Sequence, residues 1–134
     1  IREQLNGHII LIVGNHDDKN RTQGIDALFD YVTYQMRINV DGRTVYVNHF
    51  PFMCFAHWNS EKYPREHLAF ALSGHVHLQK NYEGSDKSIL NHYLPTQYDV
   101  GVDFNNFKPV SWEKINEKIN YQIDNKCNLT YWIN

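Results

Sequence analysis

Three short polar motifs in the sequence carry residue types that bind metal ions and transfer protons. They are Asn15-His16-Asp17, Asn48-His49 and Gly74-His75-Val76-His77. Two histidines one residue apart in a strand would lie on the same face, about 6–7 Å apart. That distance does not suit the chelation of one ion. It suits two ions that lie roughly 3.5–4 Å apart and each bind one imidazole.

Each motif taken alone also has an ordinary structural interpretation. Asn15-His16-Asp17 could form an Asx turn, His49 could be a hydrogen-bonded core histidine, and His75 and His77 could lie on a surface loop. The three motifs nevertheless share one property, because each comes directly after a predicted strand. The carboxyl ends of strands in an open α/β sheet meet at one edge, where ligands bind. We therefore expect the three motifs to form a single site.

The segments before the motifs are predicted to be strands of an α/β fold. The continuous apolar run His8–Val13 predicts a strand that is covered on both faces, and Leu68–Leu72 predicts a second buried strand. Alternation of apolar and polar residues predicts a strand over Tyr31–Val40. Asp41-Gly42 is a strong hairpin signal and predicts a return strand over Arg43–Asn48.

The rest of the chain is predicted to form connections, one strand and one amphipathic helix. Ser111 is the expected cap of that helix, whose apolar residues recur at helical spacing and are expected to face the core. The last ten residues predict either a final strand or a fraying tail. The other expected elements are a helical turn at Gly24–Leu28, an aromatic loop at Phe52–Glu66, a hairpin at Gln79–Leu94 with its tip at Glu83-Gly84-Ser85-Asp86, and a strand at Tyr98–Phe104.

Length and composition indicate one globular domain of 134 residues, 42% of them hydrophobic. The net charge is −2 and no block of lysine or arginine occurs, which argues against a dedicated nucleic-acid or membrane-surface binder. No apolar run approaches the roughly 18 residues of a transmembrane helix. Cys54 and Cys127 belong to no Cys-x-x-Cys pair, and two lone thiols fit a reducing, cytoplasmic environment.

In their order along the chain, the motifs Gly14-Asn15-His16-Asp17, His49 and Gly74-His75-Val76-His77 resemble those of the calcineurin-like metallophosphoesterases, especially small phage and bacterial members. The resemblance extends from about residue 8 to about residue 120 and includes Gly101-Val102-Asp103 and Pro109-Val110-Ser111. It implies a four-layer α/β/β/α sandwich. It also implies hydrolysis of a phosphate monoester or diester by a water molecule activated between two divalent metal ions.

The resemblance implies which residues bind these two ions. Asn15, His49 and His75 are expected to bind one ion, and His77 is expected to bind the other. Ligands of this kind suit Mn, Fe, Zn or Ni rather than Ca. Neither the residues nor the resemblance chooses among these metals, and neither sets the oligomeric state.

Further roles follow for the residues that would contact the substrate. His16 is expected to contact the scissile phosphate and to protonate or stabilise the leaving oxygen, and Asp17 is expected to orient His16. The aromatic loop could form a wall of the pocket and stack on a substrate such as a nucleotide, or its aromatic residues could simply pack the loop. The residues expected to form that wall are His57, Trp58 and Asn59.

Two motifs that begin the family's pattern, Asp-x-His and Gly-Asp, occur nowhere in this sequence. The remaining ligands are neutral, and two divalent ions without a bridging carboxylate would repel each other strongly. Ile1–Leu5 is predicted to be the tail of a helix, and the first residue is not Met. We therefore expect residues 1–134 to be a single domain that lacks an N-terminal strand–helix unit of roughly 30 residues or more. The alternatives are a catalytically inactive scaffold of this fold that binds a protein partner, and a separate chain that completes the site.

Overall fold

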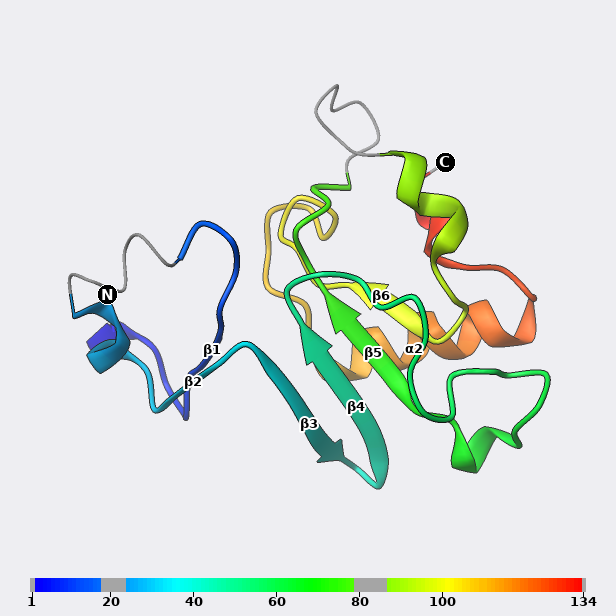
Figure 1. The fold of residues 1–134 in the computed structure, drawn as a ribbon, viewed down its shortest axis with the longest axis horizontal. Helices are drawn as coiled ribbons and strands as arrows, with labels where there is room; N and C mark the ends of the chain where they lie inside the picture. The colour runs from blue at the N-terminus through cyan, green and yellow to red at the C-terminus, as the bar shows by residue number, and fades with distance from the viewer. Residues whose placement is uncertain (1, 18–23, 79–86, 134) are drawn as a thin grey trace.

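The structure is a computed structural model that describes residues 2–17, 24–78 and 87–133. Within these ranges the fold is mixed α/β, with two sheets, one α-helix and several 3₁₀ turns (Figure 1). The helix is α2 (Trp112–Asp124). None of the described helices is long and apolar enough to cross a membrane.

The larger sheet positions the candidate site at the edge where its parallel strands end. Its order is β3 (Gln35–Val40), β4 (Arg43–Asn48), β5 (Phe70–Ser73) and β6 (Gln97–Asp99). β3 and β4 are antiparallel, whereas β4, β5 and β6 are parallel to one another. The carboxyl ends of β4, β5 and β6 therefore lie side by side.

The predicted hairpin between β3 and β4 is confirmed. Val40 pairs with Arg43, and the two residues between them have positive φ angles of 51° at Asp41 and 81° at Gly42. A two-residue turn with both φ angles positive matches the right-handed twist of the flanking strands. The Asp41-Gly42 turn thus sets the register of the pair.

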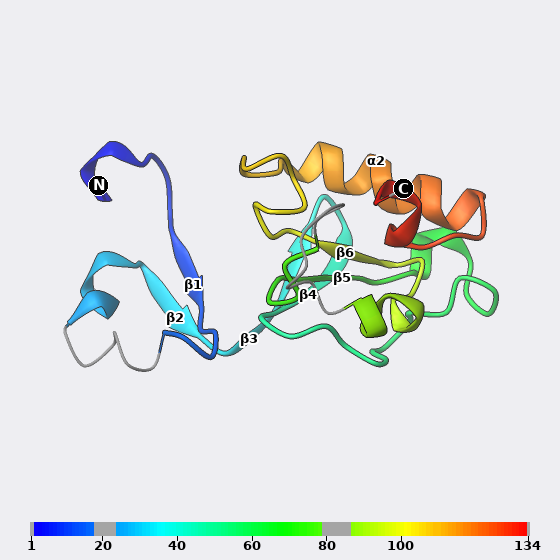
Figure 2. The same ribbon diagram turned by 90° about the horizontal axis from the view of Figure 1, so that it is seen from above.

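The smaller sheet contains β1 (Ile10–Ile12) and β2 (Tyr31–Thr33), paired in parallel, and it lies beside the main body (Figures 1 and 2). Two expectations fail here. The first strand is not covered on both faces, since Ile10 is 44% exposed. The single strand expected over Tyr31–Val40 is interrupted at Tyr34, where the Thr33 hydroxyl donates to the Gln35 carbonyl and the chain leaves for the other sheet.

Helix α2 covers one face of the larger sheet (Figure 2). Ser111 caps it as expected, because its Oγ accepts a hydrogen bond from the Lys114 backbone nitrogen at 3.3 Å. The predicted apolar stripe faces the sheet. Its contact with the strands forms the main core, whose buried members are Leu68, Phe70, Tyr98, Ile115 and Ile119.

A fully buried polar side chain, Gln122, also joins α2 to the sheet. Its Nε2 donates to the carbonyl oxygens of Pro95 at 2.8 Å and Gln97 at 3.0 Å, and its Oε1 accepts from Trp132 Nε1 at 2.9 Å. Every polar atom of this amide is therefore used, which is the condition for burying it without a desolvation penalty.

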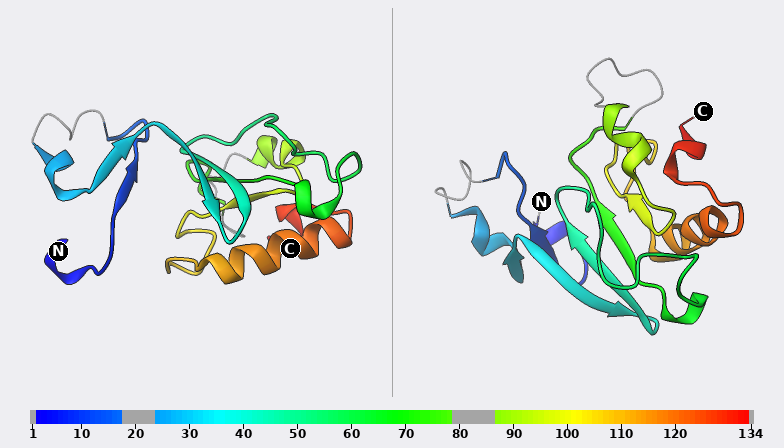
Figure 3. Two further views of the ribbon diagram at one scale, coloured as in Figure 1. Left: turned by 90° about the horizontal axis from the view of Figure 1, so that it is seen from below. Right: turned by 45° about the vertical axis from the view of Figure 1, so that its right-hand side comes forward.

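The aromatic loop covers part of the opposite face of the sheet (Figure 3). The rings of Tyr46, Phe52 and Phe55 pack with centroids 5.6–6.4 Å apart. Gln97 Nε2 donates to the Phe52 carbonyl at 2.7 Å and fixes the start of the loop.

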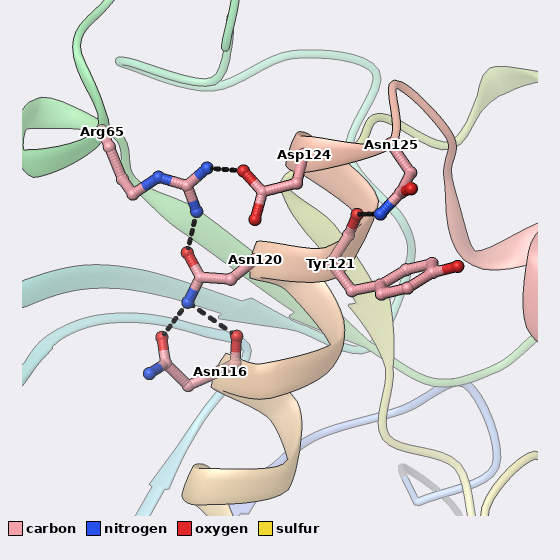
Figure 4. Close-up of polar contacts among 6 residues, drawn as sticks. All are labelled: Arg65, Asn116, Asn120, Tyr121, Asp124 and Asn125. Carbon is pink, nitrogen blue, oxygen red and sulfur yellow. Dashed lines mark hydrogen bonds and ion pairs between the residues drawn. The ribbon is translucent and has the colours of Figure 1, made fainter.

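A polar network fixes the other end of the aromatic loop to α2 (Figure 4). Arg65 donates to Asn120 Oδ1 at 2.6 Å and forms an ion pair with Asp124. Asn120 in turn donates to the carbonyl and side-chain oxygens of Asn116, at 2.8 and 3.0 Å. These contacts attach the turn before β5 to the carboxyl-terminal half of the helix.

Three predictions in the second half of the chain differ from the structure, and part of the first of them lies outside the described residues. The expected hairpin tip, Glu83 to Asp86, lies outside them, and Lys87–His92 forms the 3₁₀ turn η4 instead of a strand. β6 ends at Asp99 because the Asn105 side chain donates to the Asp99 and Gly101 carbonyls and turns the chain. The chain end is neither a strand nor a fraying tail, since η5 (Leu129–Trp132) buries Leu129 completely.

Candidate metal centre

The loops that follow β1, β4 and β5 bring three potential ligand atoms together. The distance from Asn15 Oδ1 to His49 Nε2 is 2.8 Å, from His49 Nε2 to His75 Nδ1 3.0 Å, and from Asn15 Oδ1 to His75 Nδ1 3.1 Å. The three atoms thus form a nearly equilateral triangle, which we call the ligand triangle. In the sequence, His49 and His75 come 34 and 60 positions after Asn15.

Hydrogen bonds alone cannot satisfy all three sides of the ligand triangle. The Asn15 oxygen carries no proton, and each ring nitrogen carries at most one, so no more than two sides can be hydrogen bonds. A cation above the plane of the triangle would accept a lone pair from all three atoms. Two ligands about 2.1 Å from a metal ion and at right angles are roughly 3.0 Å apart, so the donor set fits a transition-metal ion.

Asn15 contributes an amide oxygen, so the ligand triangle holds only two residues among the metal-binding types His, Cys, Asp and Glu. Within the described ranges, no three residues of those four types form a group arranged to hold a metal ion. The geometric fit therefore depends on the amide oxygen as the third ligand.

Gly14 is required by the close approach of His49. A Cβ atom at Gly14 would lie 2.6–2.9 Å from three atoms of the His49 imidazole, which is too close for any side chain. Asp17 closes the same loop, because its Oδ2 accepts from the Gly14 backbone nitrogen at 2.7 Å and its own nitrogen donates to the Gly14 carbonyl at 3.1 Å. Asp17 thereby positions the loop that carries Asn15. Its expected action on His16 stays a prediction.

The environment of His49 lowers its pKa below the usual value for histidine. Burial is the main cause, followed by the neighbouring His75, while the carboxylate of Asp17 opposes the shift. His16 and His77 lower the pKa of His49 further, so both lie within electrostatic range of the triangle. A lowered pKa keeps the imidazole neutral near pH 7, which is the form that binds metal ions.

His75 and His77 follow β5 in strained turns instead of continuing the strand. Their φ angles are 71° and 50°, in the left-handed region that residues other than glycine rarely adopt. Such conformations cost about 1–3 kcal/mol each and persist where packing enforces them, often at functional sites. Here Val76 and Leu78 supply the packing, since both are buried in the second core cluster with Tyr93.

His77 does not join the ligand triangle and pairs instead with Asp103. Its Nδ1 lies 2.5 Å from Asp103 Oδ2. A carboxylate on Nδ1 fixes the tautomer that has its lone pair on Nε2, the arrangement usual for a metal-binding histidine. The sequence pattern did not assign Asp103 to the site. The available signal was an acidic residue just after a strand that ends at the same edge.

Asp99 lies within electrostatic range of His77 and is 1% exposed. Its Oδ1 accepts from the Gly101 nitrogen at 2.7 Å, while its Oδ2 has no hydrogen-bond partner among the described residues. Burial raises the pKa of Asp99 to about 6, with the Asp103 carboxylate adding to the shift and His77 opposing it. The Tyr93 hydroxyl is also buried, and burial together with Asp99 raises its pKa, while Ser73 opposes the shift.

The structure does not bring the expected substrate wall to the ligand triangle. The His57 carbonyl accepts from the Ala69 nitrogen at 3.1 Å, just before β5, and the Trp58 carbonyl accepts from Thr96 Oγ1 at 2.9 Å, just before β6. Both contacts are at the amino ends of these strands, whereas the triangle is beyond their carboxyl ends. The Asn59 side chain is used in a local turn, where its Oδ1 accepts from the nitrogen two residues later.

A different aromatic residue, Phe50, lies at the triangle. Its ring centroid is 4.6 Å from that of His75 and 5.0 Å from that of His49, and 45% of the residue is exposed. The sequence pattern identified Phe50 only as part of the strand end. Its position makes it the aromatic side chain best placed to contact a molecule bound at this edge.

Comparison with known proteins supports the fold without adding a function. No family model matches the sequence, and no curated protein matches it. Among solved structures, the chain is similar to AQ665 from Aquifex aeolicus, a protein of unknown function, with a TM-score of 0.58 and 23% sequence identity. The similarity covers 87% of this chain and 63% of that protein, so the chain spans less than two thirds of its neighbour's length.

Proposed function

We propose that Asn15, His49 and His75 bind one divalent transition-metal ion, that His77 binds a second, and that the domain hydrolyses a phosphate monoester or diester. The ligand triangle, with all three sides between 2.8 and 3.1 Å, is the observation that carries this proposal. The ordered motifs support it, because they resemble those of calcineurin-like metallophosphoesterases. On the same grounds we propose that the two sheets and α2 belong to a four-layer α/β/β/α sandwich.

Each residue of the site has a defined part in this proposal. When bound, the metal ions would lower the pKa of a water molecule and offset the charge of the phosphoryl oxygens. His49 would stay neutral because its pKa is lowered. His16 would contact the phosphate and give a proton to the leaving oxygen, and Asp17 would hold the loop that carries His16.

The sequence offers more ligands to one of the two proposed ions than to the other. The first would have three ligands, Asn15, His49 and His75, whereas the second would have His77 alone. Two adjacent divalent ions also need carboxylate ligands to offset their repulsion. Asp103 is close to the proposed position of the second ion, but its Oδ2 is already hydrogen-bonded to His77 Nδ1. We therefore expect residues 1–134 to bind one ion tightly.

The metal part of the proposal is tested by Mn²⁺ stoichiometry, measured by equilibrium dialysis at pH 7.5. The wild type should bind one ion, and His75→Ala should lose it because a side of the triangle is removed. His67→Ala is the matched control, since this exposed histidine lies just before β5, at the end of the strand far from the triangle. Equal Mn²⁺ binding by wild type and His75→Ala would refute the assignment of the ligands.

The chemical part is tested separately by the turnover of bis-p-nitrophenyl phosphate with Mn²⁺, in a form of the protein that binds both ions. In that form His16→Ala should retain both ions and lose most of the rate, because proton transfer to the leaving group typically contributes 10²–10⁴-fold. Normal turnover by His16→Ala would contradict the acid role of His16 while leaving the metal site intact.

A further inference from the structure

A cavity of about 250 Å³ lies on the face of the larger sheet that is turned away from α2. The segment that follows β4 forms one wall through Pro51, Phe52 and Met53, and η4 contributes Ile89 to the other. Gln97, the first residue of β6, also lines the cavity. No function assigned above uses this space.

Two of the segments that line the cavity also lead to the candidate metal centre. Pro51 comes two residues after His49, and between them Phe50 packs its ring on His75. On β6, Gln97 at the cavity and Asp99, within electrostatic range of His77, are two residues apart, about 7 Å along a strand. Along the chain, two residues therefore separate the lining of the cavity from His49 on one segment and from Asp99 on the other.

The cavity presents apolar surface because its polar atoms are already engaged. Gln97 Nε2 donates to the Phe52 carbonyl at 2.7 Å, and Gln97 Oε1 accepts from the Leu94 nitrogen at 2.8 Å. The Tyr93 hydroxyl is buried and therefore does not open into the cavity. His92 also lines the cavity and is the side chain there that can still offer a hydrogen bond, so the rest of the lining is mainly apolar.

The size of the cavity limits its occupant. An apolar cavity of about 150 Å³ is known to hold benzene, and pockets for drug-sized ligands start at about 300 Å³. A volume of about 250 Å³ thus suits one ring or two fused rings. Phe52 is fixed by its packing against Tyr46 and Phe55, whereas Met53 at the rim is 87% exposed and can adapt to the bound group.

We infer that this cavity binds the organic group of the phosphoester substrate, and that this group is an apolar or aromatic ring. The inference rests on the proposed phosphoesterase function, because it takes the position of the phosphate from the ligand triangle.

The test compares two phosphonates that cannot be hydrolysed, naphthylmethylphosphonate and methylphosphonate, by calorimetric titration of the Mn²⁺-loaded protein. The wild type should bind the naphthyl compound at least about tenfold more tightly. Met53→Trp and Ile89→Phe fill the cavity from opposite walls, and each should remove the preference without changing the affinity for methylphosphonate. Leu28→Trp, which adds an indole at an exposed position on η2, is the control and should keep the preference.

The absence of a ring preference in the wild type, or its survival in both filling variants, would overturn the inference. Titration with 1-naphthol, which has no phosphate mimic, separates this outcome from failure of the proposed function. Naphthol binding that Met53→Trp abolishes supports the cavity even if neither phosphonate binds in a metal-dependent way. Naphthol that binds equally to wild type and Met53→Trp contradicts it.

Discussion

Replacement of Asp99 by asparagine should stabilise the protein at neutral pH. The Asp99 carboxylate is 1% exposed, and its Oδ2 has no hydrogen-bond partner among the described residues. Above its pKa the folded state must therefore hold a buried negative charge that, within the described part of the chain, accepts a hydrogen bond from the Gly101 nitrogen alone. Asparagine keeps an acceptor for that nitrogen and removes the charge.

The size and sign of the effect follow from the pKa of Asp99. Its folded-state value of about 6 lies about two pH units above the ordinary value of 3.8. Between these two values the folded state holds a proton that the unfolded state has lost, so stability falls as the pH rises. At 1.36 kcal/mol for each pH unit, the loss is about 3 kcal/mol above pH 6. Asp99→Asn should recover up to that amount at pH 7–8 and should gain nothing below about pH 4.

Urea unfolding at several pH values between 3.5 and 8, with EDTA present, would measure this difference. The free energy of unfolding of Asp99→Asn minus that of the wild type should rise from near zero at pH 4 to about 2–3 kcal/mol at pH 7. Glu61→Gln, a carboxylate-to-amide change at an exposed residue of the aromatic loop, is the matched control and should give a flat difference.

A difference between Asp99→Asn and wild type that does not change with pH would refute the reasoning, because it would mean that Asp99 titrates alike in the folded and unfolded states. A difference that becomes negative at pH 7 would show that the ionised carboxylate is stabilised by a contact outside those described.

Three further outcomes are expected. Asp103→Asn should weaken Mn²⁺ binding at the position of His77 by about 10–100-fold in any form of the protein that binds the second ion, because the carboxylate that fixes the imidazole is lost; unchanged affinity in dialysis would contradict this. Gln122→Leu should reduce the free energy of unfolding by about 2–4 kcal/mol, since it removes the hydrogen bonds to the Trp132 N–H, the Pro95 carbonyl and the buried Gln97 carbonyl. Urea unfolding measures this, and a loss below 1 kcal/mol would argue against it. Ser111→Ala should cost about 1 kcal/mol through loss of the cap of α2, whereas Ser111→Asp should restore most of it in the same assay.

Local sequence signals predicted the elements that depend on neighbouring residues. The Asp41-Gly42 turn and the Ser111 cap were found because each rests on backbone geometry or hydrogen bonds within a few residues. Strand ends carrying polar motifs were found in the same way. The prediction placed Asn15, His49 and His75 at the edge of one sheet, whereas β1, which precedes Asn15, belongs to the smaller sheet.

Local signals failed where a side-chain hydrogen bond ended or interrupted an element, and where the expected tertiary packing is incomplete. The strand expected over Tyr98–Phe104 stops after Asp99 because Asn105 folds back on the backbone. The apolar run around Ile10 predicted a strand covered on both faces, but Ile10 is 44% exposed. Apolar periodicity gives the type of an element and does not say what packs against it.

The sequence by itself determined which residues could bind metal and that they follow strands, since residue type and strand ends are local properties. Only the tertiary structure decided that Asn15, His49 and His75 meet within 3.1 Å, that His77 pairs with Asp103, and that His57 lies at the other end of the sheet. Strand order and parallel direction cause these differences. They decide which loops share an edge, and they are fixed by packing between segments far apart in the chain.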